Sequence, residues 1–155
     1  MLIRDALPGE LPAIGDLRVA AYQADGFGNG DYADELRRLG TDGSGEVLAA
    51  VDGETLVGTV MLWPWPNADE IARGPGEAEI RALAVAPQAR GRGIGRELIG
   101  AVVGRAAGRG VRHLLLLTRP EMRAAQHLYT GAGFRRLPER DISPGVALIA
   151  YGLEL

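Results

Sequence analysis

The stretch that decides the fold runs from Ala82 to Gly95 and reads ALAVAPQARGRGIG. An apolar segment predicted as a strand leads into Pro87, a loop rich in glycine and arginine follows, and a helix is predicted to begin near Ile94. Glycines let the backbone turn sharply and approach a ligand closely. The first turn of a helix presents unpaired N–H groups and the positive end of its dipole. Together these features predict a phosphate-binding site.

Two common phosphate-binding loops do not match this stretch. A P-loop requires a lysine, and all seventeen basic residues of this chain are arginines. A dinucleotide-binding loop requires G-x-G-x-x-G and an acidic residue about twenty positions later. Here the third glycine, Gly95, comes one position early, and Leu115 lies twenty positions beyond it. Both of these loop types are therefore excluded.

The segment R-G-R-G-I-G resembles motif A of the GNAT superfamily of N-acetyltransferases, Q/R-x-x-G-x-G/A, with matches at Arg90, Gly93 and Gly95. A second segment, AAQHLYTGAGF at 124–134, is similar to motif B of the same superfamily, A-x-x-L-Y-x-x-x-G-F. The matching residues of motif B are Ala125, Leu128, Tyr129, Gly133 and Phe134. The resemblance extends over the whole chain and is most specific over residues 79–136.

The resemblance implies an α/β GNAT fold in one acetyltransferase domain over residues 1–155. Its central sheet would be mixed and mostly antiparallel, with six or seven strands splayed at the fourth and fifth, and about four helices would flank it. Hydrophobic periodicity and turn residues predict strands over 2–4, 46–51, 55–63, 79–85, 113–117, 134–137 and 146–155. Helices are predicted from Pro8 or Glu10 onward, over 32–39 and 94–107, and from Pro120 or Glu121 onward, with Thr118 and Glu121 as a capping box.

The amino-acid composition excludes several kinds of catalytic and metal site. The chain has no cysteine, which excludes disulfides, thiolate catalysis and cysteine-ligated zinc, and its two histidines exclude a histidine-rich metal site. We therefore expect no metal. No stretch has the length of a signal peptide or a membrane span, so we expect a cytoplasmic protein with no membrane partner.

Charge is unevenly distributed. Residues 1–80 have five arginines and fifteen acidic residues, a net charge of −10, whereas residues 81–155 have twelve arginines and five acidic residues, a net charge of +7. The basic half suits a polyanionic ligand, although two solvated faces would give the same pattern. Nucleic acid is disfavoured as a partner, because the pI is about 5.4 and the arginines cluster around one loop.

By the resemblance, the donor is acetyl-coenzyme A, and backbone amides of the motif A loop hold its pyrophosphate. Its pantetheine arm would pair with the backbone of the fourth strand as an added strand does. Arginine side chains could reach the phosphates, or they could be solvated residues at the start of a helix. The residues expected to bind coenzyme A are Leu83, Ala84, Val85, Arg90, Gly91, Arg92, Gly93, Ile94, Gly95 and Arg96.

Two residues are candidates for catalysis. By the resemblance, Tyr129 protonates the departing thiolate, and a phenol of pKa about 10 is able to do so at neutral pH. The alternative is that Tyr129 packs on the apolar face of its helix.

By the resemblance, Glu79 occupies the position of the general base in the histone-acetyltransferase branch. The alternative interpretation is that Glu79 is an ordinary exposed residue of its strand. Other branches place a base on the fifth strand, where this chain has Thr118.

Several features leave the acceptor open. Many family members have asparagine where this chain has Met122. Trp63 and Trp65 could wall an acceptor pocket or pack at a sheet edge, and His113 and His127 are interpreted as packing or surface residues. The acidic residues of 22–45 and 63–78 favour a cationic small molecule or a peptide amine as the acceptor. A non-catalytic or partner-regulated acyl-coenzyme A-binding module is the alternative function, and a homodimer is common in the superfamily.

Overall fold

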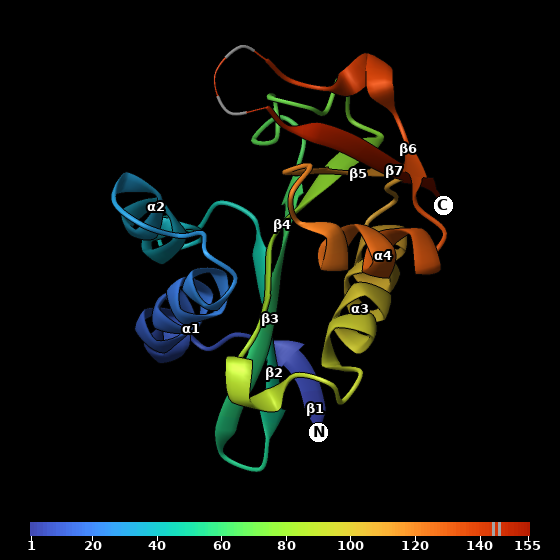
Figure 1. The fold of residues 1–155 in the computed structure, drawn as a ribbon. Coiled ribbons are helices and arrows are strands. Elements are labelled where there is room, and N and C mark those ends of the chain that lie inside the picture. Colours follow the sequence, from blue (N-terminus) through green and yellow to red (C-terminus); the bar gives the residue numbers. More distant parts are fainter. Residues whose placement is uncertain (144, 146) are drawn as a thin grey trace. The chain divides into compact units, whose positions relative to one another are not determined.

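A computed structural model describes residues 1–143, 145 and 147–155. These residues form a mixed sheet with the strand order β1-β2-β3-β4-β5-β7-β6 (Figure 1). The strands are β1 Leu2–Asp5, β2 Glu46–Asp52, β3 Thr55–Pro64, β4 Glu77–Val85, β5 His113–Thr118, β6 Arg135–Arg136 and β7 Ile149–Glu154. The described part has four α-helices, α1 Leu11–Ala24, α2 Asp31–Arg38, α3 Ile94–Gly108 and α4 Arg123–Gly131, and short 3₁₀ turns at Pro8–Glu10, Pro87–Ala89 and Pro138–Arg140.

The predicted α/β architecture is confirmed, with seven strands and four helices in the described residues. β1 pairs antiparallel with β2, β5 with β7, and β6 with β7, while β4 and β5 are parallel. The parallel register covers Glu77–Ile80 of β4 and His113–Leu116 of β5. The predicted splay of these two strands beyond that register stays a prediction. The predicted strand 146–155 begins at Val146, which lies outside the described residues, and its described part contains β7.

The chain divides into two compact units. The first comprises Met1–Met61 and Ala82–Val102, and the second comprises Leu62–Arg81 and Val103–Leu155. That the whole chain forms a single acetyltransferase domain stays a prediction. No helix of the described residues is long and apolar enough to cross a membrane.

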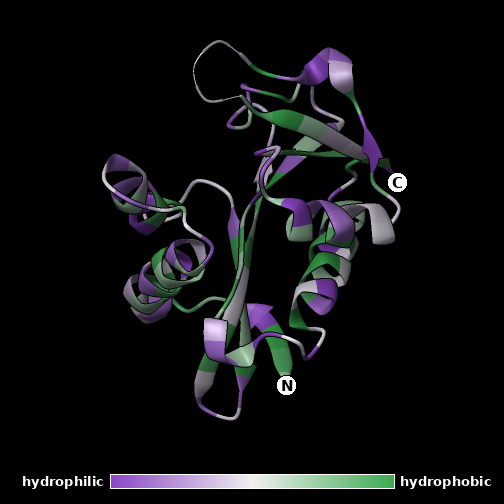
Figure 2. Ribbon diagram, in the orientation of Figure 1, coloured by the Kyte–Doolittle hydropathy of each residue, from purple (hydrophilic) through white to green (hydrophobic). Residues whose placement is uncertain are grey.

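In the first unit, α1 and α2 lie side by side against β2 and β3 (Figure 1). Both helices carry alternating hydrophilic and hydrophobic stripes (Figure 2), as expected of helices with one face on a core. Ile14 of α1 packs with Ala49 and Val51 of β2. Arg18, only 1% exposed, donates hydrogen bonds to the carbonyl oxygens of Leu36 (2.9 Å) and Leu39 (2.8 Å). This buried cation therefore fixes the C-terminal end of α2, where unpaired carbonyls collect.

In the second unit, β5 is the central strand, as its run of four leucines predicts. Leu114, Leu115 and Leu116 are at most 1% exposed. Leu115 packs with Ile71 and with Ala150 of β7 to form the core of this unit. Gly152 of β7 has no room for a side chain, because a Cβ there would lie 2.6 Å from His113 Nε2 and from Leu137 Cδ1. The close approach of His113 supports its interpretation as a packing residue.

The predicted capping box at the start of α4 is wrong. The helix begins at Arg123, its N-cap residue is Met122, and the N-cap has no side-chain hydrogen bond. Thr118 is instead buried at the end of β5, where its hydroxyl donates to Met122 Sδ at 3.7 Å. The Met122 N–H bonds the Arg119 carbonyl at 3.0 Å, so a turn containing Pro120 delays the helix.

Candidate active site

The fourth strand contains one extra residue. The Trp65 N–H bonds the Glu77 carbonyl at 3.3 Å and the Ala86 N–H bonds the Val57 carbonyl at 2.9 Å, so eight residue steps on β3 face nine on β4. Ala82, between these points, has φ +52°, a left-handed conformation that is uncommon outside glycine. These observations identify a β-bulge at Ala82. The parallel register between β4 and β5 covers Glu77–Ile80 and does not include Leu83–Val85. The binding of the pantetheine arm along these residues stays a prediction.

The motif A loop follows directly. Gly91 and Gly93 have φ +82° and +78°, and a Cβ added to either would meet nothing within 4 Å, so the space beside the loop is open. α3 begins at Ile94, which is 4% exposed and anchors the helix. The N–H groups of its first turn point back along the helix axis toward the loop. The predicted sequence of strand, glycine loop and helix N-terminus is therefore present.

Gly58 of β3 brings the helix close to the sheet. A Cβ at this position would lie 2.9 Å from Leu98 Cδ1, 3.2 Å from Ile94 Cγ2 and 3.2 Å from the Ala84 carbonyl oxygen. Any side chain would push α3 away from β3 and β4. Glycine at this position therefore fixes the distance between the helix N-terminus and the bulged strand.

The three arginines of the loop differ in their partners. Arg90 donates two hydrogen bonds to the Asp25 carboxylate (2.7 and 3.1 Å) and one to the Ala21 carbonyl (2.9 Å). Arg92 pairs with Asp52 at 3.2 Å. Arg96 is exposed, and the described residues offer it no ion pair. Arg90 and Arg92 thus hold the loop to its own unit, with side chains that are still 41% and 51% exposed. That any of the three arginines binds a phosphate stays a prediction.

Tyr129 lies in the second unit, on the buried face of α4. It is 7% exposed, and its ring centroid is 6.0 Å from that of Phe134 and 6.4 Å from that of Tyr151. The Phe134 N–H bonds the Tyr129 carbonyl at 3.0 Å across the turn at Gly133, whose φ is +98°. Motif B therefore builds an aromatic cluster that orients the tyrosine. This packing is compatible with both of its predicted roles.

Glu79 is buried, so its interpretation as an exposed strand residue is wrong. It is 3% exposed, and its Oε1 has no hydrogen-bond partner among the described residues. Burial raises the pKa of this carboxyl to about 7, partly offset by the positive charge of Arg81 and reinforced by the negative charge of Glu70. A carboxyl that titrates near neutrality is suited to general base catalysis at physiological pH.

The sequence did not predict that Arg81 and Trp63 lie close to Glu79 and to each other. Arg81 Nε lies 3.7 Å from Glu79 Oε2, and the Arg81 guanidinium carbon lies 4.6 Å from the centroid of the Trp63 ring. Trp63 Nε1 is buried without a hydrogen-bond partner among the described residues. Trp65, by contrast, is 36% exposed. The alternation of strand side chains places Glu79 and Arg81 on one face, a signal that the sequence does contain.

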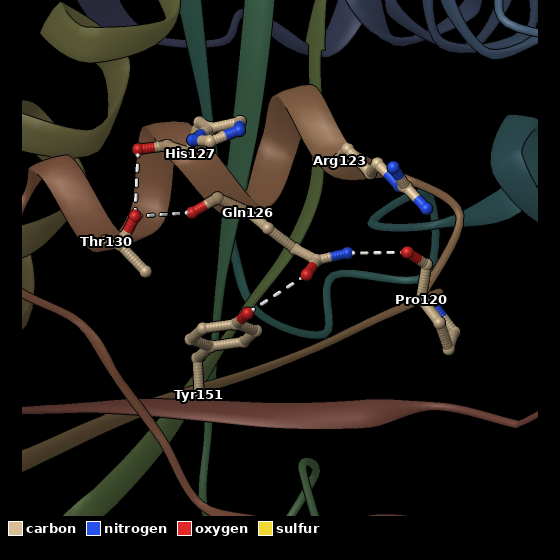
Figure 3. Close-up of a pocket in the computed structure, with 6 residues that line it drawn as sticks. All are labelled: Pro120, Arg123, Gln126, His127, Thr130 and Tyr151. Carbon is tan, nitrogen blue, oxygen red and sulfur yellow. Dashed lines mark hydrogen bonds between the residues drawn. The ribbon is translucent and has the colours of Figure 1, made fainter.

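A shallow pocket of about 320 Å³ lies between α4 and β7 (Figure 3). Gln126 crosses it, donating to the Pro120 carbonyl at 2.9 Å and accepting from the Tyr151 hydroxyl at 3.1 Å. Exposed His127 lies at its rim, which agrees with the interpretation of a surface residue. Because Tyr151 packs against Tyr129, the hydrogen bond that fixes the Tyr151 hydroxyl also helps to fix the aromatic cluster.

Comparisons with known proteins identify the family and the fold. The model of the acetyltransferase (GNAT) family matches residues 11–134. A mycothiol acetyltransferase from Cellulomonas flavigena is 37% identical over 97 residues, which cover 61% of this chain and 28% of that protein. The chain thus matches less than a third of the length of this curated relative.

Solved structures share the fold. The PaiA N-acetyltransferase of Thermoplasma acidophilum, in complex with coenzyme A, has a TM-score of 0.76 at 15% identity over 99% of this chain and 98% of that one. A GNAT family acetyltransferase of Elizabethkingia anophelis with acetyl-coenzyme A bound has a TM-score of 0.72 at 23% identity over 99% and 97%. Because the family model spans most of the sequence, the chain belongs to the acetyltransferase (GNAT) family.

Proposed function

We propose that this protein is an acetyl-coenzyme A-dependent N-acetyltransferase that moves an acetyl group directly to the primary amine of a small molecule or peptide. The observation that carries the proposal is the bulged strand followed by an open glycine loop and a helix N-terminus, at Ala82–Ile94. Family membership supports the same activity, and of two structural neighbours one is in complex with coenzyme A and the other has acetyl-coenzyme A bound.

The residues present suit coenzyme A. The N–H groups in the first turn of α3 suit a pyrophosphate, and so does the open space beside Gly91 and Gly93. The backbone of Leu83–Val85 beyond the bulge suits the amide-bearing pantetheine arm, which would add as a strand does. Arg96 supplies a cation that its own unit does not neutralise. When bound, the donor supplies an activated acetyl group.

This chain's own groups then move two protons and stabilise one charge. Glu79, titrating near pH 7, takes a proton from the acceptor ammonium, directly or through water. A backbone N–H near Val85 stabilises negative charge on the carbonyl oxygen as the amine attacks. Tyr129 gives its proton to the departing sulfur. The second proton that the amine nitrogen loses on forming the amide passes to solvent, from which the Tyr129 phenolate recovers its proton. The absence of cysteine excludes a cysteine-linked acyl-enzyme, which favours direct transfer.

The acceptor is proposed only by class. Asp31, Asp34, Asp69 and Glu70 belong to the acidic half of the chain and favour a cationic substrate. Asp25, which the sequence places in the same set, is already neutralised by Arg90.

The test is an assay of thiol release from acetyl-coenzyme A against a panel of amines, amino acids, aminoglycosides, polyamines and peptide N-termini. Amine-dependent thiol release is the expected result. Tight binding of acetyl-coenzyme A with no thiol release across the panel would instead identify a non-catalytic binding module.

A further inference from the structure

A side chain of the motif A loop reaches the C-terminal end of α1. Arg90 donates hydrogen bonds of 2.7 and 3.1 Å to the two oxygens of the Asp25 carboxylate, and a third, of 2.9 Å, to the Ala21 carbonyl oxygen. Among the residues that the structure describes, the guanidinium has no other partner. Arg90 and Asp25 are 65 residues apart in the sequence, and both belong to the first unit. The contact therefore holds the loop to the end of α1 within that unit.

The end of α1 depends on this contact. The last carbonyl groups of a helix lack intrahelical partners, and that end carries partial negative charge. Residues 21–24 include no basic residue, and the C-cap residue is Asp25, an acid at the end of a helix where an acid is unfavourable. The Asp25 N–H bonds the carbonyl of Tyr22 at 3.1 Å and not that of Ala21. Arg90 therefore supplies both the cation and the donor that the end of α1 lacks.

We propose that Arg90 is a positioning residue, which docks the motif A loop on α1 through Asp25 and acts on coenzyme A by holding the loop amides in place, not by contact with a phosphate. This inference rests on the proposed function, in which the loop holds the pyrophosphate. A guanidinium that forks on a carboxylate is already neutralised, and its donors are directed at α1. Asp25 is the second positioning residue, because it acts through Arg90.

The loop needs such an anchor because its backbone is permissive. Gly91 and Gly93 have positive φ and open space beside them. The other arginine contact of the loop, from Arg92 to Asp52 at 3.2 Å, is a single ion contact. The two ion pairs have similarly exposed side chains, at 41% and 54% for the Arg90 pair and 51% and 50% for the Arg92 pair. Because a forked pair fixes geometry and a single exposed contact contributes little, the Arg90 pair is the one that positions the loop.

The two possible roles of Arg90 predict opposite effects of Asp25→Asn on coenzyme A binding. If Arg90 contacted a phosphate, this variant would free its cation and remove a nearby negative charge, so coenzyme A would bind more tightly. In our account the loop loses its anchor, and coenzyme A should bind about three- to tenfold more weakly in titration calorimetry. Asp52→Asn is the charge-matched control, because it removes the same charge from the weaker pair of the loop. Its affinity should stay within about twofold of the wild type.

Arg90→Lys separates position from charge. Lysine keeps the positive charge but lacks the planar fork that reaches the carboxylate and the Ala21 carbonyl together. This variant should weaken coenzyme A binding as much as Asp25→Asn does. Because both residues act through one contact, the double variant should bind no more weakly than either single variant. Wild-type affinity in Arg90→Lys, tighter binding in Asp25→Asn, or additive losses in the double variant would overturn the inference.

Nitrogen-15 relaxation of the free protein gives a readout that needs no coenzyme. The order parameters of the Gly91, Arg92 and Gly93 amides should fall in Asp25→Asn and in Arg90→Lys, and should stay close to the wild-type values in Asp52→Asn. Unchanged order parameters in Arg90→Lys would overturn the inference even if the enzyme acetylates amines. Lower order parameters in a protein that binds no coenzyme A would leave the anchoring of the loop as described and contradict only the proposed function.

Discussion

Glu77 and Glu79 lie two residues apart on the same strand, yet their carboxyl groups have pKa values of about 2 and about 7. Glu77 accepts two hydrogen bonds from Arg140, one from the Arg73 N–H at 2.9 Å, and lies 3.2 Å from His113 Nδ1. Glu79 is more deeply buried and has one loose cation. One strand thus holds a structural carboxylate and a group suited to proton transfer.

Breaking the Glu77–Arg140 pair should destabilise the protein. Arg140→Gln leaves a part-buried carboxylate without its main partner, and we expect a loss of about 1–3 kcal/mol in the free energy of unfolding at pH 7. The pKa of Glu77 lies below its ordinary 4.5, so its contribution is present above pH 4.5 and is lost as the pH falls toward 2. The difference between wild type and variant, measured by urea titration, should therefore shrink over that window.

Arg4→Gln is the matched control, because the Arg4–Glu10 pair has similar geometry with more exposed side chains, at 31% and 27% against 12% and 17%. Solvent screening should make its loss the smaller of the two. An equal loss in both variants would show that burial does not set the strength of the Glu77 pair.

Glu79 should lower stability at neutral and alkaline pH. Its pKa in the folded protein exceeds the ordinary value of 4.5, so the folded state holds the proton more tightly, and stability contributed by this group falls as the pH rises from 4.5 to about 7. Glu79→Gln removes the buried charge and should raise the free energy of unfolding above pH 7 by an amount on the order of 1–3 kcal/mol. The two proteins should converge below pH 4.5. A variant less stable than the wild type at pH 8 would contradict the raised pKa.

Tyr129→Phe should lower kcat by about 10²–10⁴-fold and leave the affinity for coenzyme A unchanged, because the substitution removes the proton donor and keeps the aromatic ring. Tyr151→Phe is the control in the same aromatic cluster, since it loses only its hydroxyl bond to Gln126. Steady-state thiol release measures both. Unchanged turnover in Tyr129→Phe would refute its assignment as the acid and leave it as a packing residue.

Gly93→Ala should weaken coenzyme A binding. An alanine at φ +78° is strained by about 1 kcal/mol, so the loop would relax away from the conformation that exposes its amides. Gly53→Ala introduces the same kind of strain in the β2–β3 turn, at φ +61°. Titration calorimetry should show weaker coenzyme A binding in Gly93→Ala alone. Equal affinities in both variants would argue against the loop as the pyrophosphate site.

Hydrophobic periodicity and turn residues predicted most of the helices and strands. The predicted strands 46–51 and 55–63 correspond to β2 and β3, and the predicted helices 32–39 and 94–107 correspond to α2 and α3, because periodicity and turn residues act within a few residues. The predicted start of α4 was wrong because the surrounding structure overrides the local signal there. Thr118 and Glu121 have the spacing of a capping box, but the strand ladder of β5 and a turn at Pro120 decide the local conformation.

The electrostatics of the site could not be read from the sequence in the same way. Arg90 is paired with Asp25, 65 residues away, and Arg92 with Asp52, 40 residues away, so which loop arginine remains available depends on packing. Burial of Glu79 likewise follows from the central position of its strand in the sheet. The residue types therefore indicate which candidate side chains can bind phosphate or transfer a proton. The fold determines which of these side chains are paired and which are buried.

The central claim is acetyl transfer from acetyl-coenzyme A to an amine, and product stoichiometry tests it most directly. With an accepted amine, the protein should form free coenzyme A thiol and acetylated amine in equal amounts, with no acetyl group retained on the protein. Saturable binding of acetyl-coenzyme A with neither product formed, for every amine class in the panel, would contradict it.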